Sequence, residues 1–205
     1  MRITLAARAS HVNTVPYNVM MPARKTPPEA WVHAAFVALA EGGPDAIRVE
    51  ALAATMGVTK GGFYREFADR NALIERVLNT WEQAVVDVVI TQVEDSADEP
   101  RTKLRRLFDL ARGYTSETDA LSVELAIRDW ARRDRGVAQR LSRVDNRRMA
   151  YMRTLFRQIS ADHDDAEARC LLIFSLFVAN SFIVADHDGR TRDMVIDAAL
   201  DKVLA

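Results

Sequence analysis

Apolar residues recur every three or four positions along almost the whole chain, which is the spacing of one face of an α-helix. Strict alternation of apolar and polar residues, which is typical of β-strands, is rare. Nearly half of the 205 residues are apolar, whereas glycine and proline are few. We therefore predict an all-α protein with about nine helices.

Glycine, proline and charged clusters divide the pattern into separate helices. The first helix has Thr26 as a candidate N-cap and Pro27 at its first position, where the missing N–H does no harm. Gly42, Gly43 and Pro44 end this helix. The other predicted helices span residues 49–56, 59–67, 70–93, 103–114, 121–134, 137–159, 166–185 and 194–204.

Residues 48–67 combine a short helix, a turn containing Gly57 and a second short helix, which is the order of a helix-turn-helix. In that motif the second helix enters the major groove of DNA, and its N-terminal residues meet the base edges. Phe63 and Phe67 are one turn apart, so we expect both to hold this helix on the core. Tyr64 projects to another side, where its hydroxyl can contact a phosphate; a buried core tyrosine is the alternative.

The second helix begins with two glycines, although each glycine costs a helix about 0.5–1 kcal/mol relative to alanine. Without side chains at Gly61 and Gly62, the backbone amides and the positive helix N-terminus can approach DNA closely. Tight packing against the first helix is the alternative explanation. We expect Thr59 to cap the helix with its hydroxyl and offer it to a phosphate, and Lys60 to reach a guanine edge or a phosphate. Arg70 is placed to contact the DNA backbone on the flank.

Composition and charge narrow the class of protein further. The single cysteine, Cys170, lies in an apolar run and is expected to be a small core residue, which fits a cytoplasmic location. No apolar stretch reaches the roughly 18–20 residues that span a bilayer, and residues 1–24 lack a secretory signal pattern and are expected to form a flexible arm.

Residues 101–157 carry 15 Lys and Arg against 7 Asp and Glu. We interpret that basic block as solvated helix faces, because residues 48–67 offer the better geometry for nucleic acid.

The sequence IRVEALAATMGVTKGGFYREFADRNALIERVL is similar to the N-terminal domain of the TetR/AcrR family of bacterial transcriptional regulators. The resemblance covers residues 25–80. Two positions depart from the family pattern: Gly62 replaces what is often a base-reaching side chain, and Glu66 replaces a common histidine. The matching positions are Leu52, Ala53, Gly57, Val58, Thr59, Lys60, Gly61, Tyr64, Phe67, Arg70, Ala72 and Leu73.

The resemblance implies a DNA-binding domain at residues 25–80 and an effector-binding and dimerisation domain at residues 81–205. It implies a homodimer that binds a palindromic operator as a repressor and is released by a small-molecule effector. The apolar periodicity of residues 166–204 independently indicates two amphipathic helices suited to pairing two subunits. The candidate DNA-contact residues are Arg48, Thr59, Lys60, Gly61, Gly62, Tyr64 and Arg70.

An effector would be enclosed by the helices of residues 71–160, where aromatic and methionine side chains suit an adaptable apolar cavity. Ordinary core packing is the alternative for each of these side chains. Spacing does not decide whether Glu124, Arg128, Arg147 or Arg148 points inward. The candidate lining residues are Trp81, Val85, Phe108, Ala111, Tyr114, Leu125, Trp130, Met149, Met152, Phe156 and Phe177.

The residues give little support to an enzyme. The lysine near Gly57 and Gly62 is on the wrong side of the second glycine for a phosphate-binding loop. His163 and His187 are each flanked by aspartates, which we interpret as solvated charge and not as a metal site. We predict no catalytic residue, cofactor or metal. The remaining alternative, a helical small-molecule-binding or dimerisation protein without specific DNA binding, leaves residues 59–64 unexplained.

Overall fold

The computed structural model describes residues 26–95, 98–113, 120–160, 162–180 and 182–205. Within these ranges every regular element is helical, and there are nine α-helices if the unbroken run from residue 70 to residue 94 is counted as one. The predicted all-α class is confirmed. The arm predicted for residues 1–24 lies outside the described residues. None of the described helices is long and apolar enough to cross a membrane.

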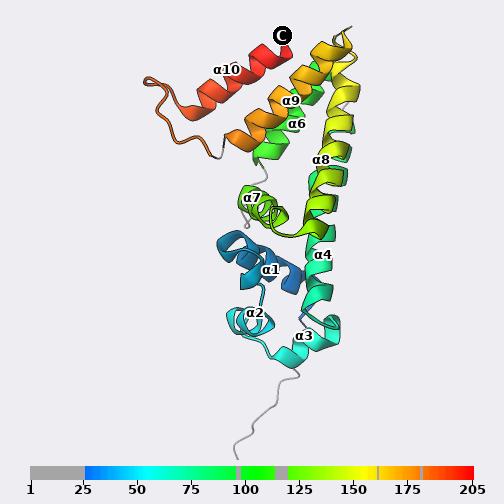
Figure 1. Cartoon of the computed structure of the whole chain (residues 1–205), viewed down its shortest axis with the longest axis vertical. Coiled ribbons are helices and arrows are strands. Elements are labelled where there is room, and N and C mark those ends of the chain that lie inside the picture. The colour runs from blue at the N-terminus through cyan, green and yellow to red at the C-terminus, as the bar shows by residue number, and fades with distance from the viewer. Residues whose placement is uncertain (1–25, 96–97, 114–119, 161, 181) are drawn as a thin grey trace, which may run out of the picture.

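Three N-terminal helices form one end of the molecule (Figure 1). They are α1 (Pro28–Gly42), α2 (Val49–Thr55) and α3 (Lys60–Glu66), and the short 3₁₀ turn η1 (Pro44–Ala46) joins the first two. Trp31 of α1 is fully buried and provides the centre on which the other two helices pack.

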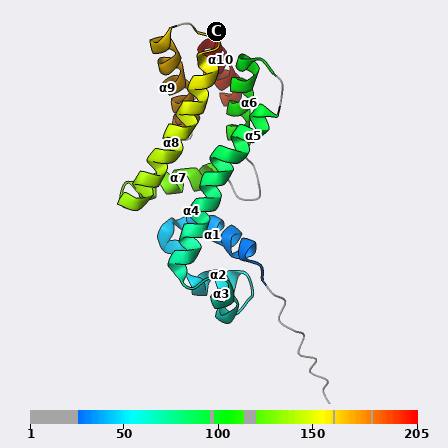
Figure 2. The same ribbon diagram turned by 90° about the vertical axis from the view of Figure 1, so that its right-hand side faces the viewer.

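A long helical run connects this end to the rest of the molecule (Figure 2). It comprises α4 (Arg70–Glu82), the π-helical segment η2 (Gln83–Val88) and α5 (Val89–Glu94). Asp69 begins it as N-cap, because its Oδ1 accepts a hydrogen bond of 2.8 Å from the Ala72 N–H. The predicted helix 70–93 is confirmed. The spacing of its apolar residues did not indicate the π-helical turn within it.

The remaining helices build the opposite end. These helices are α6 (Pro100–Gly113), α7 (Ala120–Ala131), α8 (Arg135–Phe156), α9 (His163–Ala179) and α10 (Arg192–Leu204). The helix α7 lies between the N-terminal helices and the group of α6, α9 and α10, while α8 runs alongside the α4–α5 run (Figures 1 and 2).

The predicted helix 166–185 is wrong at its C-terminal end, because α9 stops at Ala179. The Arg192 guanidinium donates to the carbonyl oxygens of Asn180, at 2.5 Å, and of Ile183. The last carbonyls of a helix have no hydrogen-bond partner within the helix. Arg192, at the start of α10, supplies a donor to the carbonyl of Asn180 at the C-terminal end of α9. Residues 182–184 lie outside the helix in the connection to α10, and Val184 is 98% exposed.

Two apolar cores hold the helices together. The first joins α1, α2, α3 and α4 to Val123 and Ile127 of α7 and to Val137 and Val144 of α8. The second joins α6, α9, α10 and the C-terminal half of α8, and it contains the predicted core residue Cys170 with no exposed surface. The apolar packing thus does not divide at residue 80, since α7 packs directly on α1.

Arg70 fixes the turn between α1 and α2 to the start of α4. Its Nε donates to the carbonyl of Ile47 and its Nη2 to the carbonyl of Pro44, both at 2.6 Å. Hydrogen bonds from a charged donor are about twice as strong as neutral ones. Arg70 is half-buried and bonded inside the protein through these two nitrogens. Its predicted contact with DNA stays a prediction.

Arg70→Ala should lower the free energy of unfolding by about 2 kcal/mol, because two carbonyls lose a charged donor. Denaturant titration measures this change. Arg76→Ala is the control, since Arg76 is exposed and reaches Glu29 only at 4.0 Å, and it should change stability by less than about 0.5 kcal/mol. Equal losses in the two variants would contradict the role assigned to Arg70.

Candidate DNA-binding face and effector cavity

The turn before α3 is shaped by Gly57 and Val58. Gly57 has φ of +65°, a left-handed conformation that favours glycine, and the Val58 N–H donates to the Ala53 carbonyl at 2.9 Å. Thr59 is the N-cap residue of α3, but its side chain makes no capping hydrogen bond. The Gly62 N–H instead donates to the Thr59 backbone carbonyl at 2.9 Å, so the first turn closes through the backbone. The predicted side-chain cap at Thr59 is therefore wrong.

Two phenylalanines hold α3 on the core, as predicted. Phe63 has no exposed surface and Phe67 is 8% exposed. The Phe63 ring stacks on Phe67, with centroids 5.5 Å apart, and meets Trp31 edge-on at 5.3 Å. Such pairs stabilise by about 0.5–1.5 kcal/mol beyond burial. This packing sets which side of α3 faces away from the protein.

The outward side of α3 carries Tyr64, Lys60 and Arg65. Tyr64 is 58% exposed, which excludes the alternative of a buried core tyrosine. Lys60 is exposed and pairs with Glu50 of α2 at 2.7 Å, and the hydrogen bond from Lys60 holds the pKa of Glu50 below its ordinary value. Arg65 was missed by the sequence reasoning: it is exposed, and its Nε donates to the Gly61 carbonyl at 3.2 Å. Its place directly after Tyr64 on a seven-residue helix was the available signal.

The two glycines of α3 are not required by internal packing. A Cβ at Gly61 would meet nothing nearer than its neighbour Thr59 Oγ1 at 3.8 Å. A Cβ at Gly62 would lie 3.8 Å from Trp31 Cζ2, which is ordinary van der Waals contact. Tight packing against α1, the alternative explanation, therefore does not account for either glycine. Arg48, the other candidate DNA-contact residue, is exposed at the N-cap of α2.

A cavity of about 290 Å³ lies between α1, the π-helical segment η2 and the helices α5 to α9. Five of the predicted lining residues reach it: Trp81, Val85, Ala111, Met152 and Phe177. Glu124 and Arg148, whose direction the sequence left open, also line it. The lining residues that the sequence did not single out are His33, Phe36, Ala84, Val86, Val89, Ile90, Leu107, Ala120, Leu121, Val123, Tyr151 and Phe174.

The other predicted lining residues lie elsewhere. Phe108 and Phe156 are buried in the second core, and Met149 packs against it. Trp130 packs against the first core, and Leu125 is half-buried outside the lining. Tyr114 falls outside the described residues. These side chains share helices with lining residues, and Phe156 lies one turn from the lining residue Met152. The helical period alone therefore could not separate cavity-lining residues from core residues.

A buried ion network forms one wall of the cavity. Glu124 is 3% exposed and accepts hydrogen bonds from Arg148 Nη1 and Nη2 at 3.0 Å and from Arg128 Nε at 2.9 Å. The Trp81 Nε1–H also donates to Glu124, at 3.2 Å. Arg128 in turn binds both carboxylate oxygens of Asp145, at 2.8 and 3.0 Å. Glu124, Arg128 and Arg148 point inward, whereas Arg147 pairs with Asp87 on the surface.

The network controls the ionisation of Glu124. Burial on its own would raise the pKa of this carboxyl, but the charges and hydrogen bonds of Arg148 and Arg128 together outweigh it and hold the pKa below its ordinary value of 4.5. Glu124 therefore remains a carboxylate inside the protein. Its four donors bring α4, α7 and α8 together at one point.

The fold and the site define a class: a helix-turn-helix domain continuous with a helical domain that encloses a small apolar cavity. Residues 32–77 match the model of the bacterial regulatory proteins, tetR family. The chain thus contains a TetR-family helix-turn-helix DNA-binding domain, and the resemblance seen in its sequence is confirmed. The sequence has no match among curated proteins.

Solved structures of transcriptional regulators share the fold. The ketosteroid transcriptional regulator KstR2 of Mycobacterium tuberculosis is 18% identical, with a TM-score of 0.63 and coverage of 88% of this chain and 94% of that one. AibR in complex with isovaleryl coenzyme A and operator DNA is 16% identical, with a TM-score of 0.63 and coverage of 86% and 95%. A regulator from Saccharomonospora viridis in complex with choline is 16% identical, with a TM-score of 0.64 and coverage of 86% and 92%.

Glu124→Gln should lower the free energy of unfolding at neutral pH by about 3 kcal/mol, because two buried guanidiniums lose their shared carboxylate. A carboxyl whose pKa is lower in the folded protein than in the unfolded chain stabilises the fold at any pH above its unfolded pKa, here 4.5. This stabilisation is lost as the pH falls through the folded pKa. The variant should therefore lose less stability than the wild type as the pH falls below 4.5.

The matched control is Glu75→Gln, since Glu75 also binds an arginine but is 63% exposed. It should cost at most about 1 kcal/mol. Denaturant titrations across pH measure both variants. Two outcomes would contradict an ionised Glu124 at the centre of the network. One is an equal loss of unfolding free energy in the two variants at neutral pH, and the other is an unchanged dependence of stability on pH in Glu124→Gln below pH 4.5.

Proposed function

We propose that the protein is a homodimeric transcriptional repressor that binds a palindromic DNA operator and is released when a small molecule enters the cavity. The observation that carries the proposal is α3, which packs through Phe63 and Phe67 and turns its basic and glycine-rich tip outward. The rival is a helical ligand-binding or dimerisation protein without specific DNA binding. That rival gives no reason for two glycines that internal packing does not require.

The chemistry of the α3 tip fits a DNA groove. Lys60 and Arg65 supply cations for phosphates or guanine edges, and the Tyr64 hydroxyl is a phosphate donor at an exposed position. The absence of side chains at Gly61 and Gly62 lets the backbone approach closely. Lys60 must release Glu50 on binding, which costs little because exposed ion pairs contribute about 0–1 kcal/mol. Arg70 acts indirectly in this proposal, by fixing the N-terminal helices to α4.

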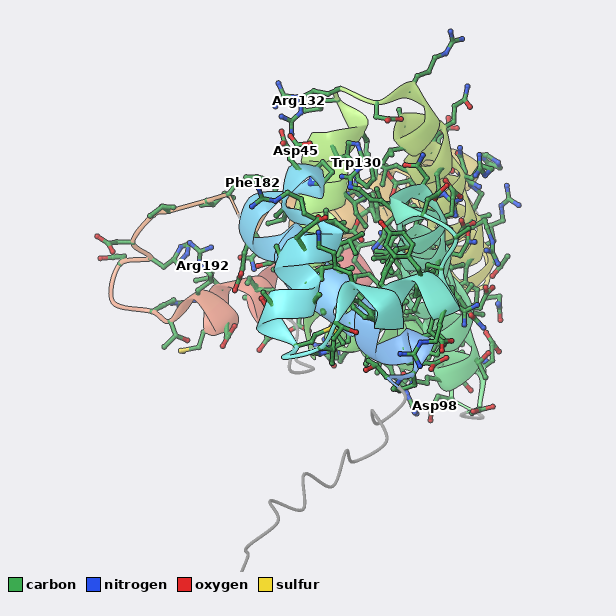
Figure 3. All side chains as sticks on the ribbon, turned by 90° about the horizontal axis from the view of Figure 1, so that it is seen from below. Asp45, Asp98, Trp130, Arg132, Phe182 and Arg192 are labelled. Atoms are coloured by element: carbon green, nitrogen blue, oxygen red, sulfur yellow. The ribbon has the colours of Figure 1, made fainter. Side chains whose placement is uncertain are left out.

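The proposed dimer face lies on α9, α10 and the connection between them. Large apolar side chains are exposed to solvent on these segments. They include Leu171, Leu172, Phe182, Ile183, Val184 and Met194. The connection that runs from Phe182 to Arg192, the first residue of α10, stands away from the other helices (Figures 1 and 3). Contiguous exposed apolar side chains mark interaction surfaces. A second copy of the chain, pairing α9 and α10 about a two-fold axis, would cover them.

The cavity is placed to influence α3. Two of its lining residues, His33 and Phe36, belong to α1, and Trp81 belongs to α4. Both helices share the first core with Phe63 of α3. A ligand that binds one arrangement of these helices more tightly shifts the population toward it, and in a dimer this changes the separation of the two α3 helices. The proposed release of DNA follows from that change.

The direct test of DNA binding is the double variant Lys60→Ala, Tyr64→Phe. An operator is first selected from a random DNA library with the wild-type protein. The double variant should bind it at least about tenfold more weakly, and its affinity should depend less on salt because a phosphate contact is lost. The thermal midpoint should stay unchanged, since Lys60 and Tyr64 are both exposed.

Arg106→Ala, a similar change at an exposed residue of α6 far from α3 and outside the proposed dimer face, is the control and should leave operator affinity unchanged. If the wild type selects no DNA sequence, the rival function without specific DNA binding is correct. If the double variant binds the operator as tightly as the wild type, α3 is not the reading helix.

The dimer is tested by Leu172→Glu, which places a charge on the proposed face at a side chain that is 57% exposed. Sedimentation equilibrium should show a dimer for the wild type and a folded monomer for this variant. Val88→Glu makes the same kind of change at an exposed apolar residue outside that face, 39% exposed, and should remain dimeric. A dimeric Leu172→Glu protein, or a monomeric wild type, would contradict the proposed interface.

A further inference from the structure

We infer that the cavity takes a neutral, mainly apolar molecule of about two six-membered rings in size, with one carbonyl-type oxygen that accepts a hydrogen bond from Arg148. This inference rests on the proposed function, because it names the ligand class for the same cavity. It follows from the volume, the charge balance and the hydrogen-bonding capacity of the wall.

The volume sets the size of the ligand. The cavity holds about 290 Å³, roughly twice the ~150 Å³ of an apolar cavity that binds benzene. Its wall is made almost entirely of aliphatic and aromatic side chains. A compact apolar body therefore fills it, whereas a nucleotide-sized group does not fit.

The charges of the wall cancel. Among the lining residues described, which also include His33, Glu124 and Arg148 form an ion pair through both carboxylate oxygens. Arg128 and Asp145 complete the network as a second pair. Two carboxylates thus face two guanidiniums. An ionic ligand would lose its hydration and find no net opposite charge, which is costly in a buried site.

A cationic ligand faces two further obstacles. A carboxylate has about four acceptor sites, and Glu124 already accepts from Arg148 twice, from Arg128 and from Trp81. One ring of the aromatic wall is already occupied by a cation, because the Arg128 guanidinium lies 5.5 Å from the centroid of Phe174. The guanidinium of Arg148 would repel a second cation within the cavity.

Arg148 can still donate to a neutral acceptor. A guanidinium has five N–H donors. Arg148 directs Nε to the Val85 carbonyl at 3.5 Å and one donor each from Nη1 and Nη2 to Glu124 at 3.0 Å. Nη1 also lies 3.7 Å from Asp145 Oδ1, which leaves the second N–H of Nη2 for a ligand oxygen. A ketone or ester oxygen suits this donor and adds no charge.

The test uses four probes of nearly equal size: benzylacetone, a neutral ketone; butylbenzene, a hydrocarbon; hydrocinnamate, an anion; and benzyltrimethylammonium, a cation. Calorimetric titration of the full-length protein without DNA measures each affinity. Benzylacetone should bind best, with butylbenzene about tenfold weaker because it lacks the charged hydrogen bond. Hydrocinnamate and benzyltrimethylammonium should bind more weakly still.

The role of Arg148 is isolated by Arg148→Gln, with Arg147→Gln as a control that changes the neighbouring surface arginine. Arg148→Gln should reduce the preference for benzylacetone over butylbenzene toward unity, and Arg147→Gln should leave it unchanged. A structural defect alone would weaken both probes together. An unchanged preference in a folded Arg148→Gln protein would overturn the assigned hydrogen bond.

Tighter binding of the anion or the cation than of the ketone by the wild type would overturn the inferred class, as would no binding of benzylacetone up to its solubility limit. These outcomes do not depend on whether Arg148→Gln folds. The proposed function is tested separately by adding benzylacetone to the protein bound to its selected operator. Ketone binding without any effect on operator affinity would leave the ligand class standing and contradict effector-controlled release.

Discussion

The carboxylate of Glu124 is the point on which the arrangement of the two ends depends. It lies inside the protein and is held by two guanidiniums and the Trp81 indole, so it ties α4, α7 and α8 to one another. A buried ion network of this kind contributes little net stability compared with apolar packing. Removing one partner is strongly destabilising, however, because it leaves the other charge buried and unpaired. Its consequence is geometric: α7 is fixed against the long helical run at the level of the cavity.

From this point the path to α3 is short and consists of packed side chains. The helix α7 lies on α1 within the first core, and α1 carries both Trp31, which contacts Phe63, and Phe36, which lines the cavity. The π-helical segment η2 also contributes lining residues, and such segments are frequent at functional sites. The cavity thus borders the DNA-binding helices themselves. Coupling requires that these helices have two arrangements whose balance a ligand changes.

Much of this architecture could be predicted from the sequence because it depends on local patterns. The apolar period gave the helices, and the spacing of Phe63 and Phe67 gave the buried side of α3. What the pattern did not indicate depends on contacts between distant residues. Arg192 of α10 donates to the carbonyl of Asn180, at the C-terminal end of α9, and Arg70 finds its partners in a turn more than twenty residues away. The helical period identified residues that face the interior. Only packing decided that Met152, a member of the second core, also lines the cavity, whereas Phe156 one turn further on does not.

The central claim, that the cavity and the DNA-binding face are coupled, is tested most directly by a distance measurement between the two protomers of the proposed homodimer. A spin label on Ala54→Cys, an exposed position of α2, reports the separation of the two DNA-binding domains. The native Cys170 is buried, and burial raises the pKa of its thiol to about 11, so it stays unlabelled. Double electron–electron resonance should show a changed distance distribution when benzylacetone saturates the cavity. An identical distribution at saturation would contradict the account.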